Sequence, residues 1–167
     1  MTAEEIRKEE IRIASLPGMQ AFFSEKMGEL AEGDKVALKF DRNDFNIGFV
    51  TQTKTMERDV ISADLVYVRW HSDKPWRDQS CDKRDWAEEH FIRLPLPIDP
   101  VNPERGLCGM CDGVVTIGKQ LFIKDSYFVS VRLTDEAGNY KKFVSFKGST
   151  PTLALLHAIA AQIGQEV

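Results

Sequence analysis

Cysteine and long apolar runs are both scarce in this chain of 167 residues. Its three cysteines are an odd number, which argues against a disulfide framework and predicts a reducing, cytoplasmic location. The longest apolar stretch, 153–163, is interrupted by His157 and Gln162 and is too short to cross a bilayer. The first ten residues are mostly charged and lack the apolar core of a signal peptide. We therefore expect no targeting segment and no membrane partner.

An excess of positive charge is missing as well. The chain has 22 basic and 26 acidic side chains, a formal net charge of −4, so it has no general attraction to nucleic acid or anionic lipid. This net charge is still compatible with a local basic face. Hydrophobic residues are 43% and charged residues 29% of the chain, which is typical of a globular protein that buries its own core. We expect it to fold without zinc and without another cofactor.

The first half begins with two predicted helices. Thr2 and Glu5 have the spacing of a capping box, and Pro17-Gly18 should end the first helix near Ala14. A stripe of apolar residues at helical spacing predicts a second helix over 19–30. Alternating and β-branched residues then predict four strands, at Lys35–Phe40, Phe45–Thr53, Leu65–Trp70 and Phe91–Leu94. A charged insert, 72–90, should contain a short helix around Trp86.

The second half is separated from the first by prolines. Four of the seven prolines lie between Leu94 and Gly106, which predicts an extended connector. Short strands are expected at Val114–Ile117 and Leu121–Ile123, followed by a hairpin of Tyr127–Leu133 and Tyr140–Phe146. Ser149 or Thr150 should cap a last helix, which buries Leu155, Leu156, Ile159 and Ile163.

The predicted fold class is therefore α+β, with a small antiparallel sheet after the N-terminal helices and a second, hairpin-based sheet packed by the C-terminal helix. The expected segments are 1–32 for the helices, 33–97 for the first β subdomain, 98–112 for the connector, and 113–167 for the hairpin sheet with its helix. Whether the two halves form one domain stays open at this point.

Four short segments resemble the strands of small SH3-like barrels of the Tudor and KOW kind. They are Gly33-Asp34-Lys35-Val36, Gly48-Phe49-Val50, Val66-Tyr67-Val68-Arg69-Trp70 and Phe91-Ile92-Arg93-Leu94-Pro95. The resemblance covers about residues 33 to 96 and implies a barrel-like sheet that binds a peptide, a nucleic acid or a partner protein. The last helix, 150–167, looks like the C-terminal ends of some small phage-encoded proteins, which implies a phage or mobile-element origin.

Cys108-Gly109-Met110-Cys111 is the sharpest local motif. Two thiolates at this spacing can hold a zinc ion from one side, and Cys81 with His90 or His71 would complete the site. No second closely spaced pair is present, so we favour the interpretation in which the cysteines are small apolar residues in the core. We predict no metal site.

The insert favours a partner-binding surface. All three tryptophans lie in it or at its edge, among alternating basic and acidic residues, and clustered Trp and Arg are typical of interfaces. The alternative is that the tryptophans belong to the core. The predicted partner-binding residues are Trp76, Arg77, Trp86, Arg69 and His71.

The hairpin sheet offers a second interpretation. Between Gly113 and Gly148 six basic and three acidic residues leave a charge of +3, and aromatic and basic side chains on one sheet face can stack bases and hold phosphates. The candidate residues are Phe128, Arg132, Lys141 and Phe143. We favour the alternative in which the last helix covers this face, because its apolar stripe needs a sheet to pack on.

These patterns predict a non-catalytic protein that binds an unidentified protein partner, as an accessory factor of a phage or mobile element. Nucleic-acid binding by the hairpin sheet is the first alternative. An enzyme that uses Cys108, Cys111 or His71 is the second, although none of these residues lies in a recognised nucleophile motif.

Overall fold

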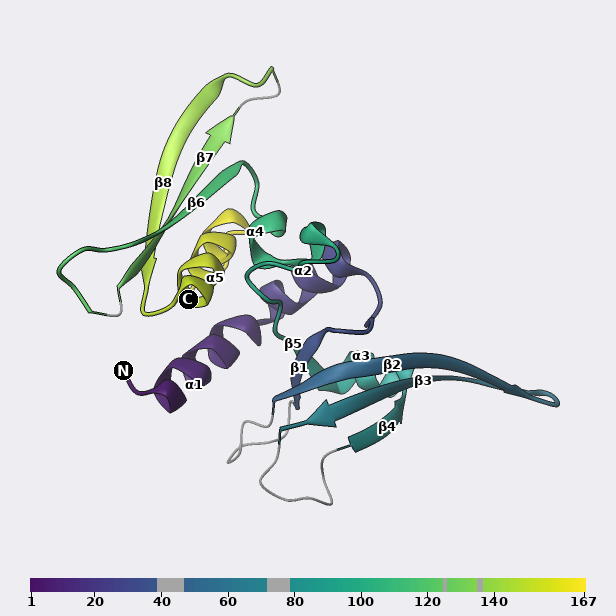
Figure 1. The fold of residues 1–167 in the computed structure, drawn as a ribbon. Coiled ribbons are helices and arrows are strands. Elements are labelled where there is room, and N and C mark those ends of the chain that lie inside the picture. Colours follow the sequence, from purple (N-terminus) through teal and green to yellow (C-terminus); the bar gives the residue numbers. More distant parts are fainter. Residues whose placement is uncertain (39–46, 72–78, 125, 135–136) are drawn as a thin grey trace. The chain divides into compact units, whose positions relative to one another are not determined.

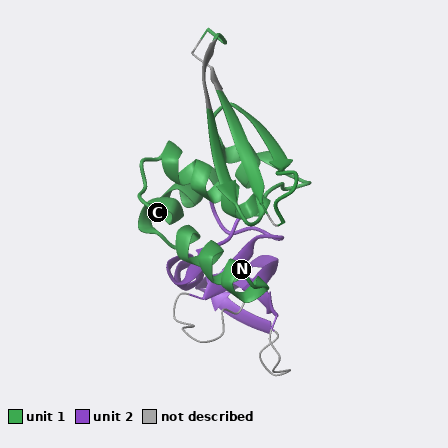
Figure 2. Ribbon diagram, turned by 90° about the vertical axis from the view of Figure 1, so that its left-hand side faces the viewer, with its two compact units in different colours: residues 1–26, 96–167 green, residues 27–95 purple. Residues whose placement is uncertain are grey.

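The computed structural model describes residues 1–38, 47–71, 79–124, 126–134 and 137–167, without the side chains at 133, 134 and 140–143. The chain divides into two compact units, coloured separately in Figure 2. Unit 1 consists of Met1–Lys26 and Leu96–Val167, and unit 2 of Met27–Pro95. The N-terminal helices therefore belong to the same unit as the C-terminal hairpin. The break at Pro95 lies in the proline-rich stretch.

Each unit contains one antiparallel sheet and its own helices (Figure 1). Unit 1 contains α1 (Ala3–Ala14), α2 (Pro17–Met27, whose last residue begins unit 2), a 3-10 helix (Pro103–Arg105), α4 (Leu107–Met110), β6 (Val114–Lys119), β7 (Tyr127–Thr134), β8 (Tyr140–Gly148) and α5 (Pro151–Gln162). Unit 2 contains β1 (Lys35–Leu38), β2 (Ile47–Arg58), β3 (Ile61–Trp70), β4 (Gln79–Lys83), α3 (Arg84–His90) and β5 (Phe91–Arg93). Within the described ranges no helix is both long and apolar enough to cross a membrane.

The α+β fold class is confirmed, but the SH3-like barrel is not. The sheet of unit 2 has the order β4-β3-β2-β1-β5, so that β4 and β5 form its two opposite edges. Only α3 lies between β4 and β5 in the chain, and it contacts β3 and β4. The described strands therefore form an open sheet with a helix across one face.

The core of unit 2 lies between this sheet and α3. Val36, Val50, Val66, Val68 and Trp70 on the strands form one buried cluster with Leu30, Ala87 and Phe91. Trp70 is buried in this core. Its ring meets Phe91 edge to face, with centroids 5.5 Å apart, and its Nε1 donates to Ser80 Oγ at 2.8 Å. Gly48 faces the indole, because a Cβ there would lie 2.6 Å from Trp70 Cε3.

Glu88 connects three segments of unit 2. Its Oε1 accepts a hydrogen bond from the backbone N–H of Leu30 at 2.8 Å, and its Oε2 accepts one from Arg93 Nη2 at 2.6 Å. Arg84 Nη1 donates to the carbonyl of Leu30 at 3.0 Å. Arg93 is buried, so its charge needs this carboxylate close by. These bonds hold α3 against β5 and the loop before β1.

Helices α1 and α5 begin where the sequence predicts, whereas α2 covers Pro17–Met27 and not 19–30. Thr2 Oγ1 accepts from Glu5 N–H at 3.2 Å, and Glu5 Oε2 accepts from Thr2 N–H at 2.6 Å, which is the expected capping box. Thr150 Oγ1 accepts from Leu153 N–H at 3.1 Å, and Pro151 lies in the first turn of α5. The β7–β8 hairpin is confirmed. Helix α5 contacts both of its strands.

Three local expectations differ from the structure. Leu121–Ile123 is not a strand but an exposed turn in which Phe122 has a φ of 69°. A backbone bond from Gln120 N–H to the Ser126 carbonyl closes this turn. Strand β4 was not expected, because its residues are mostly polar. The expected connector, 98–112, contains the 3-10 helix and α4, and Leu107 and Met110 are buried.

Candidate interaction surfaces

Among the residues predicted to bind a partner, those that the structure describes do not form one patch. Trp76 and Arg77 lie outside the described residues. Arg69 and His71 are exposed at the end of β3, and His71 meets the Phe49 ring edge to face at 5.8 Å. Trp86 lies on α3, which covers the opposite face of the sheet from the one that Arg69 occupies. The structure therefore brings Arg69 and His71 near each other and separates Trp86 from Arg69.

Trp86 is 42% exposed and is held by its neighbours. Its ring stacks on His90 with centroids 4.4 Å apart, and it meets Phe91 edge to face at 5.9 Å. His90 Nδ1 lies 2.8 Å from the Trp86 carbonyl. These contacts place the indole at the rim of the core, with part of one side open to solvent.

The face of the unit 2 sheet opposite the core is the first candidate surface, and we call it the outer face. Side chains that are paired across strands point to the same side of a sheet, and neighbours along a strand point to opposite sides. Val66, Val68 and Trp70 are buried in the core, so Leu65, Tyr67 and Arg69 point outward. The strand register extends this face to Lys35, Ile47, Phe49, Gln52, Lys54, Met56, Arg58, Ile61, Ala63, Gln79, Cys81 and Lys83, and to Ala37 and Ile92, which are buried.

Charge is segregated between the two faces of this sheet. Five of the outward residues are cations, namely Lys35, Lys54, Arg58, Arg69 and Lys83, and none is acidic. The three acidic residues of the described strands, Glu57, Asp64 and Asp82, all have inward register. The hydrogen bond from Thr55 Oγ1 to Asp64 Oδ1, at 2.5 Å, agrees with that assignment. The outer face is therefore uniformly positive.

The outer face continues onto a projecting ribbon. β2 and β3 pair with each other as far as Arg58 and Ile61, well beyond their pairing with β1 and β4, and the ribbon extends away from the sheet in Figure 1. Met56 and Ile61 are 44% and 69% exposed. Both point outward, beside Arg58 and Lys54. Apolar and basic side chains thus alternate on one side of the ribbon.

Tyr67 and Cys81 are directly opposite each other at the centre of the outer face. A hydrogen bond between the Tyr67 hydroxyl and the Cys81 thiol raises the pKa of Tyr67. The pair presents a neutral hydroxyl between the flanking cations.

The thiols of the Cys108–Cys111 motif have raised pKa values, unlike an activated nucleophile. Burial raises the pKa of the Cys108 thiol, and burial together with nearby Cys108 raises the pKa of Cys111 to about 12. A reactive cysteine needs a lowered pKa. Cys81 and His90, the other ligands of the zinc alternative, lie in unit 2. In the part of the chain that the structure describes, no three His, Cys, Asp or Glu side chains gather as a metal site.

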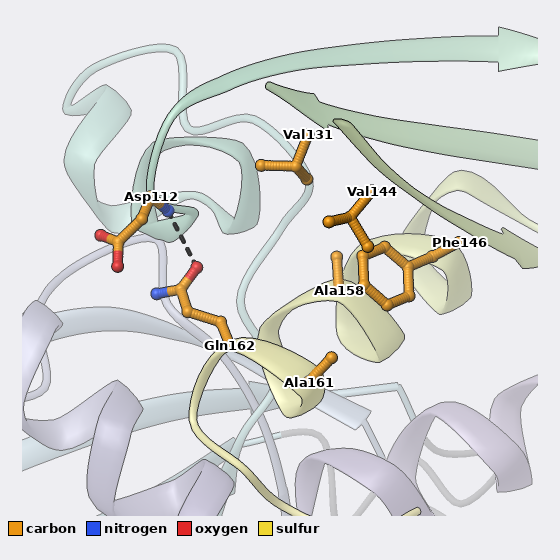
Figure 3. A pocket seen from close by; sticks show the side chains of 7 residues that line it. All are labelled: Asp112, Val131, Val144, Phe146, Ala158, Ala161 and Gln162. Carbon is orange, nitrogen blue, oxygen red and sulfur yellow. Dashed lines mark hydrogen bonds between the residues drawn. The ribbon is translucent and has the colours of Figure 1, made fainter. Parts of the chain in front are cut away.

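The hairpin sheet of unit 1 is the second candidate surface. Val129 and Val131 of β7 are buried, and Val131 points with Val144 and Phe146 toward α5 (Figure 3). Phe128 and Arg132 alternate with these valines and therefore point away from the helix. The expectation that the last helix covers the Phe128 face is wrong, because α5 packs on the valine face. Lys141 and Phe143 have side chains outside the described set.

A small pocket lies between α5 and the valine face. It has a volume of about 290 Å³ and is lined by Asp112, Val131, Val144, Phe146, Ala158, Ala161 and Gln162. The backbone N–H of Asp112 donates to Gln162 Oε1 at 2.8 Å (Figure 3), and Gln162 Nε2 donates to the Met110 carbonyl at 3.3 Å. Both ends of the Gln162 amide thus make structural bonds.

Comparison of the chain with protein-family models, with curated proteins and with solved structures finds no match.

Proposed function

We propose that this is a non-catalytic binding protein that recognises an acidic segment of a partner protein on the outer face of unit 2. The observation that carries the proposal is the charge segregation across the sheet, with five cations on one face and every strand carboxylate on the other. Complementary charge steers a partner toward such a face and disfavours partners of the same sign.

The apolar side chains favour a protein over a nucleic acid at this face. Met56, Ile61 and Leu65 are aliphatic and lie on one side of the projecting ribbon. Interfaces with proteins combine such aliphatic residues with Arg and Tyr, and these three side chains offer a base no ring on which to stack. Tyr67 at the centre is flanked by Leu65 and Arg69, which fits an amphipathic acidic segment. Trp76 and Arg77 stay predicted contacts of the same partner.

The test compares two variants of equal charge. Lys54→Glu with Arg69→Glu reverses two cations of the outer face, and Arg7→Glu with Lys124→Glu reverses two exposed cations of unit 1. Proteins captured by the immobilised wild type from a nuclease-treated host lysate are quantified by mass spectrometry for each variant. We expect the outer-face variant to lose at least 10-fold of the captured partner, and the control variant to lose less than 2-fold.

The captured partner should also carry an acidic segment, and its release should increase with salt because exposed charges are screened. Equal capture by both double variants would refute the proposal. A parallel capture from untreated lysate that is lost in the nuclease-treated lysate would assign the outer face to a nucleic acid instead.

A further inference from the structure

The open face of the β6–β7–β8 sheet in unit 1 is a second surface with its own chemistry, and it is independent of the function proposed for unit 2. By its strand register this open face contains Val114, Thr116, Gly118, Phe128, Ser130, Arg132, Ser145 and Lys147. Thr116, Arg132, Ser145 and Lys147 are exposed. Val114 is 61% exposed. Phe128 is half-buried and Ser130 is buried on this face, and α5 packs on the reverse face.

The three strands are basic in an acidic protein. They contain Lys119, Arg132, Lys141, Lys142 and Lys147 and no Asp or Glu. Since the chain as a whole has a net charge of −4 and these strands contribute +5, the remainder of the chain carries −9. A basic sheet within such a chain provides a local attraction for a polyanion.

Phe128 lies on this face in a position suited to stacking. It is directly opposite Gly118 on β6 and Lys147 on β8. A Cβ on Gly118 would overlap the Phe128 ring at Cζ and lie 2.6 Å from Cε1, so the ring rests against the backbone of the glycine. Any larger residue at 118 would lift the ring from the strand. The glycine thus holds an aromatic ring against the sheet, with a lysine beside it.

Hydroxyl groups continue the face beyond the ring. Ser130 and Ser145 are paired across the strands with their Oγ atoms 3.1 Å apart, and Thr116 is opposite Ser130. Arg132 lies two residues further along β7. An aromatic ring, the exposed hydroxyls of Thr116 and Ser145 and a cation at each end match the base, base-edge and phosphate groups of an extended strand.

We propose that the open face of β6–β7–β8 binds single-stranded nucleic acid, with a base stacked on Phe128 and a phosphate held by Lys147. A duplex does not fit this arrangement, because its bases are already stacked and show no ring face to Phe128. The aromatic ring supports a nucleic acid over an acidic peptide, for which a ring held against the sheet has no counterpart. Gly118 is a positioning residue for the ring.

The experiment is fluorescence anisotropy of the full chain with a labelled 15-nucleotide oligo(dT), with oligo(U) and with a 15-base-pair duplex, at 50 and 200 mM NaCl. We expect the single strands to bind at least 10-fold more tightly than the duplex. Lys147→Glu should weaken binding at least 10-fold. Lys119→Glu makes the same charge change on the same sheet with its side chain on the α5 side, and should weaken binding less than 2-fold.

Phe128→Leu keeps an apolar side chain over Gly118 and removes the ring, and should weaken single-strand binding about 5-fold or more while circular dichroism stays unchanged. Gly118→Ala should act in the same direction. Lys147→Ala should lower the salt slope by about 0.7, the value for one phosphate contact on a single strand.

The proposal is overturned by equal effects of the two Lys→Glu variants, by equal duplex binding, or by no binding at 50 mM NaCl. Each of these outcomes leaves the protein-binding test on unit 2 unaffected.

Discussion

Replacement of Trp70 by alanine tests whether this side chain contributes to the core of unit 2 more than a side chain at the rim does. Trp70 is 8% exposed, and a tryptophan in a core buries about 150–250 Å². At about 25 cal/mol per Å² this corresponds to about 4–6 kcal/mol, and core Trp→Ala changes cost about 3–5 kcal/mol. The indole also donates to Ser80, which would lose its partner. We therefore expect Trp70→Ala to lower the free energy of unfolding by about 4 kcal/mol.

The matched control is Trp86→Ala in the same unit. Trp86 is 42% exposed and loses mainly its ring contacts with His90 and Phe91, so its replacement should cost about 1–2 kcal/mol. Urea unfolding followed by far-ultraviolet circular dichroism measures both, with separate fits for the two units if two transitions appear. If Trp70→Ala costs no more than Trp86→Ala, the packing of the sheet face on α3 described above is refuted.

Two further predictions concern the cysteines and the cap of α5. At pH 8 iodoacetamide should modify exposed Cys81 long before Cys111, because the raised Cys111 pKa of about 12 leaves only about one thiol in ten thousand ionised. Mass spectrometry checks this, with an unfolded control in which all three cysteines react alike. Equal reaction rates of Cys81 and Cys111 in the native protein would contradict the prediction. Thr150→Ala should destabilise unit 1 by about 1 kcal/mol, because it removes the cap on Leu153 N–H. Ser149→Ala, at the neighbouring position, should cost less than half as much, and a reversed order in thermal unfolding would place the cap at Ser149.

Several elements follow from residues that are close together in the sequence. The capping residues Thr2 and Glu5 bond to each other within one turn, and Thr150 bonds to Leu153 three residues on. The β7–β8 hairpin needs only two alternating runs and a short turn. Trp70 ends a strand whose buried residues alternate. Such local interactions can be recognised in the sequence, because the interacting residues lie close together along the chain.

Long-range pairing decided the rest. β4 and the distal part of β2 are polar and mostly exposed, so their hydrogen bonds to β3 carry no hydrophobic pattern that predicts them. Leu121–Ile123 is apolar but forms an exposed turn, because the chain must reverse there between β6 and β7.

Both candidate surfaces depend on the same kind of information. β7 alternates Phe128, Ser130 and Arg132 with Val129 and Val131. Each of these two sets contains an apolar side chain on which a helix could pack. Only the placement of α5 shows that the valines are covered and that the Phe128 face is open. The sequence by itself determined where α1, α2, α5 and the β7–β8 hairpin form, through contacts along the chain. Tertiary structure decided which face each sheet exposes, because a shift of one residue in register moves every charge to the other side.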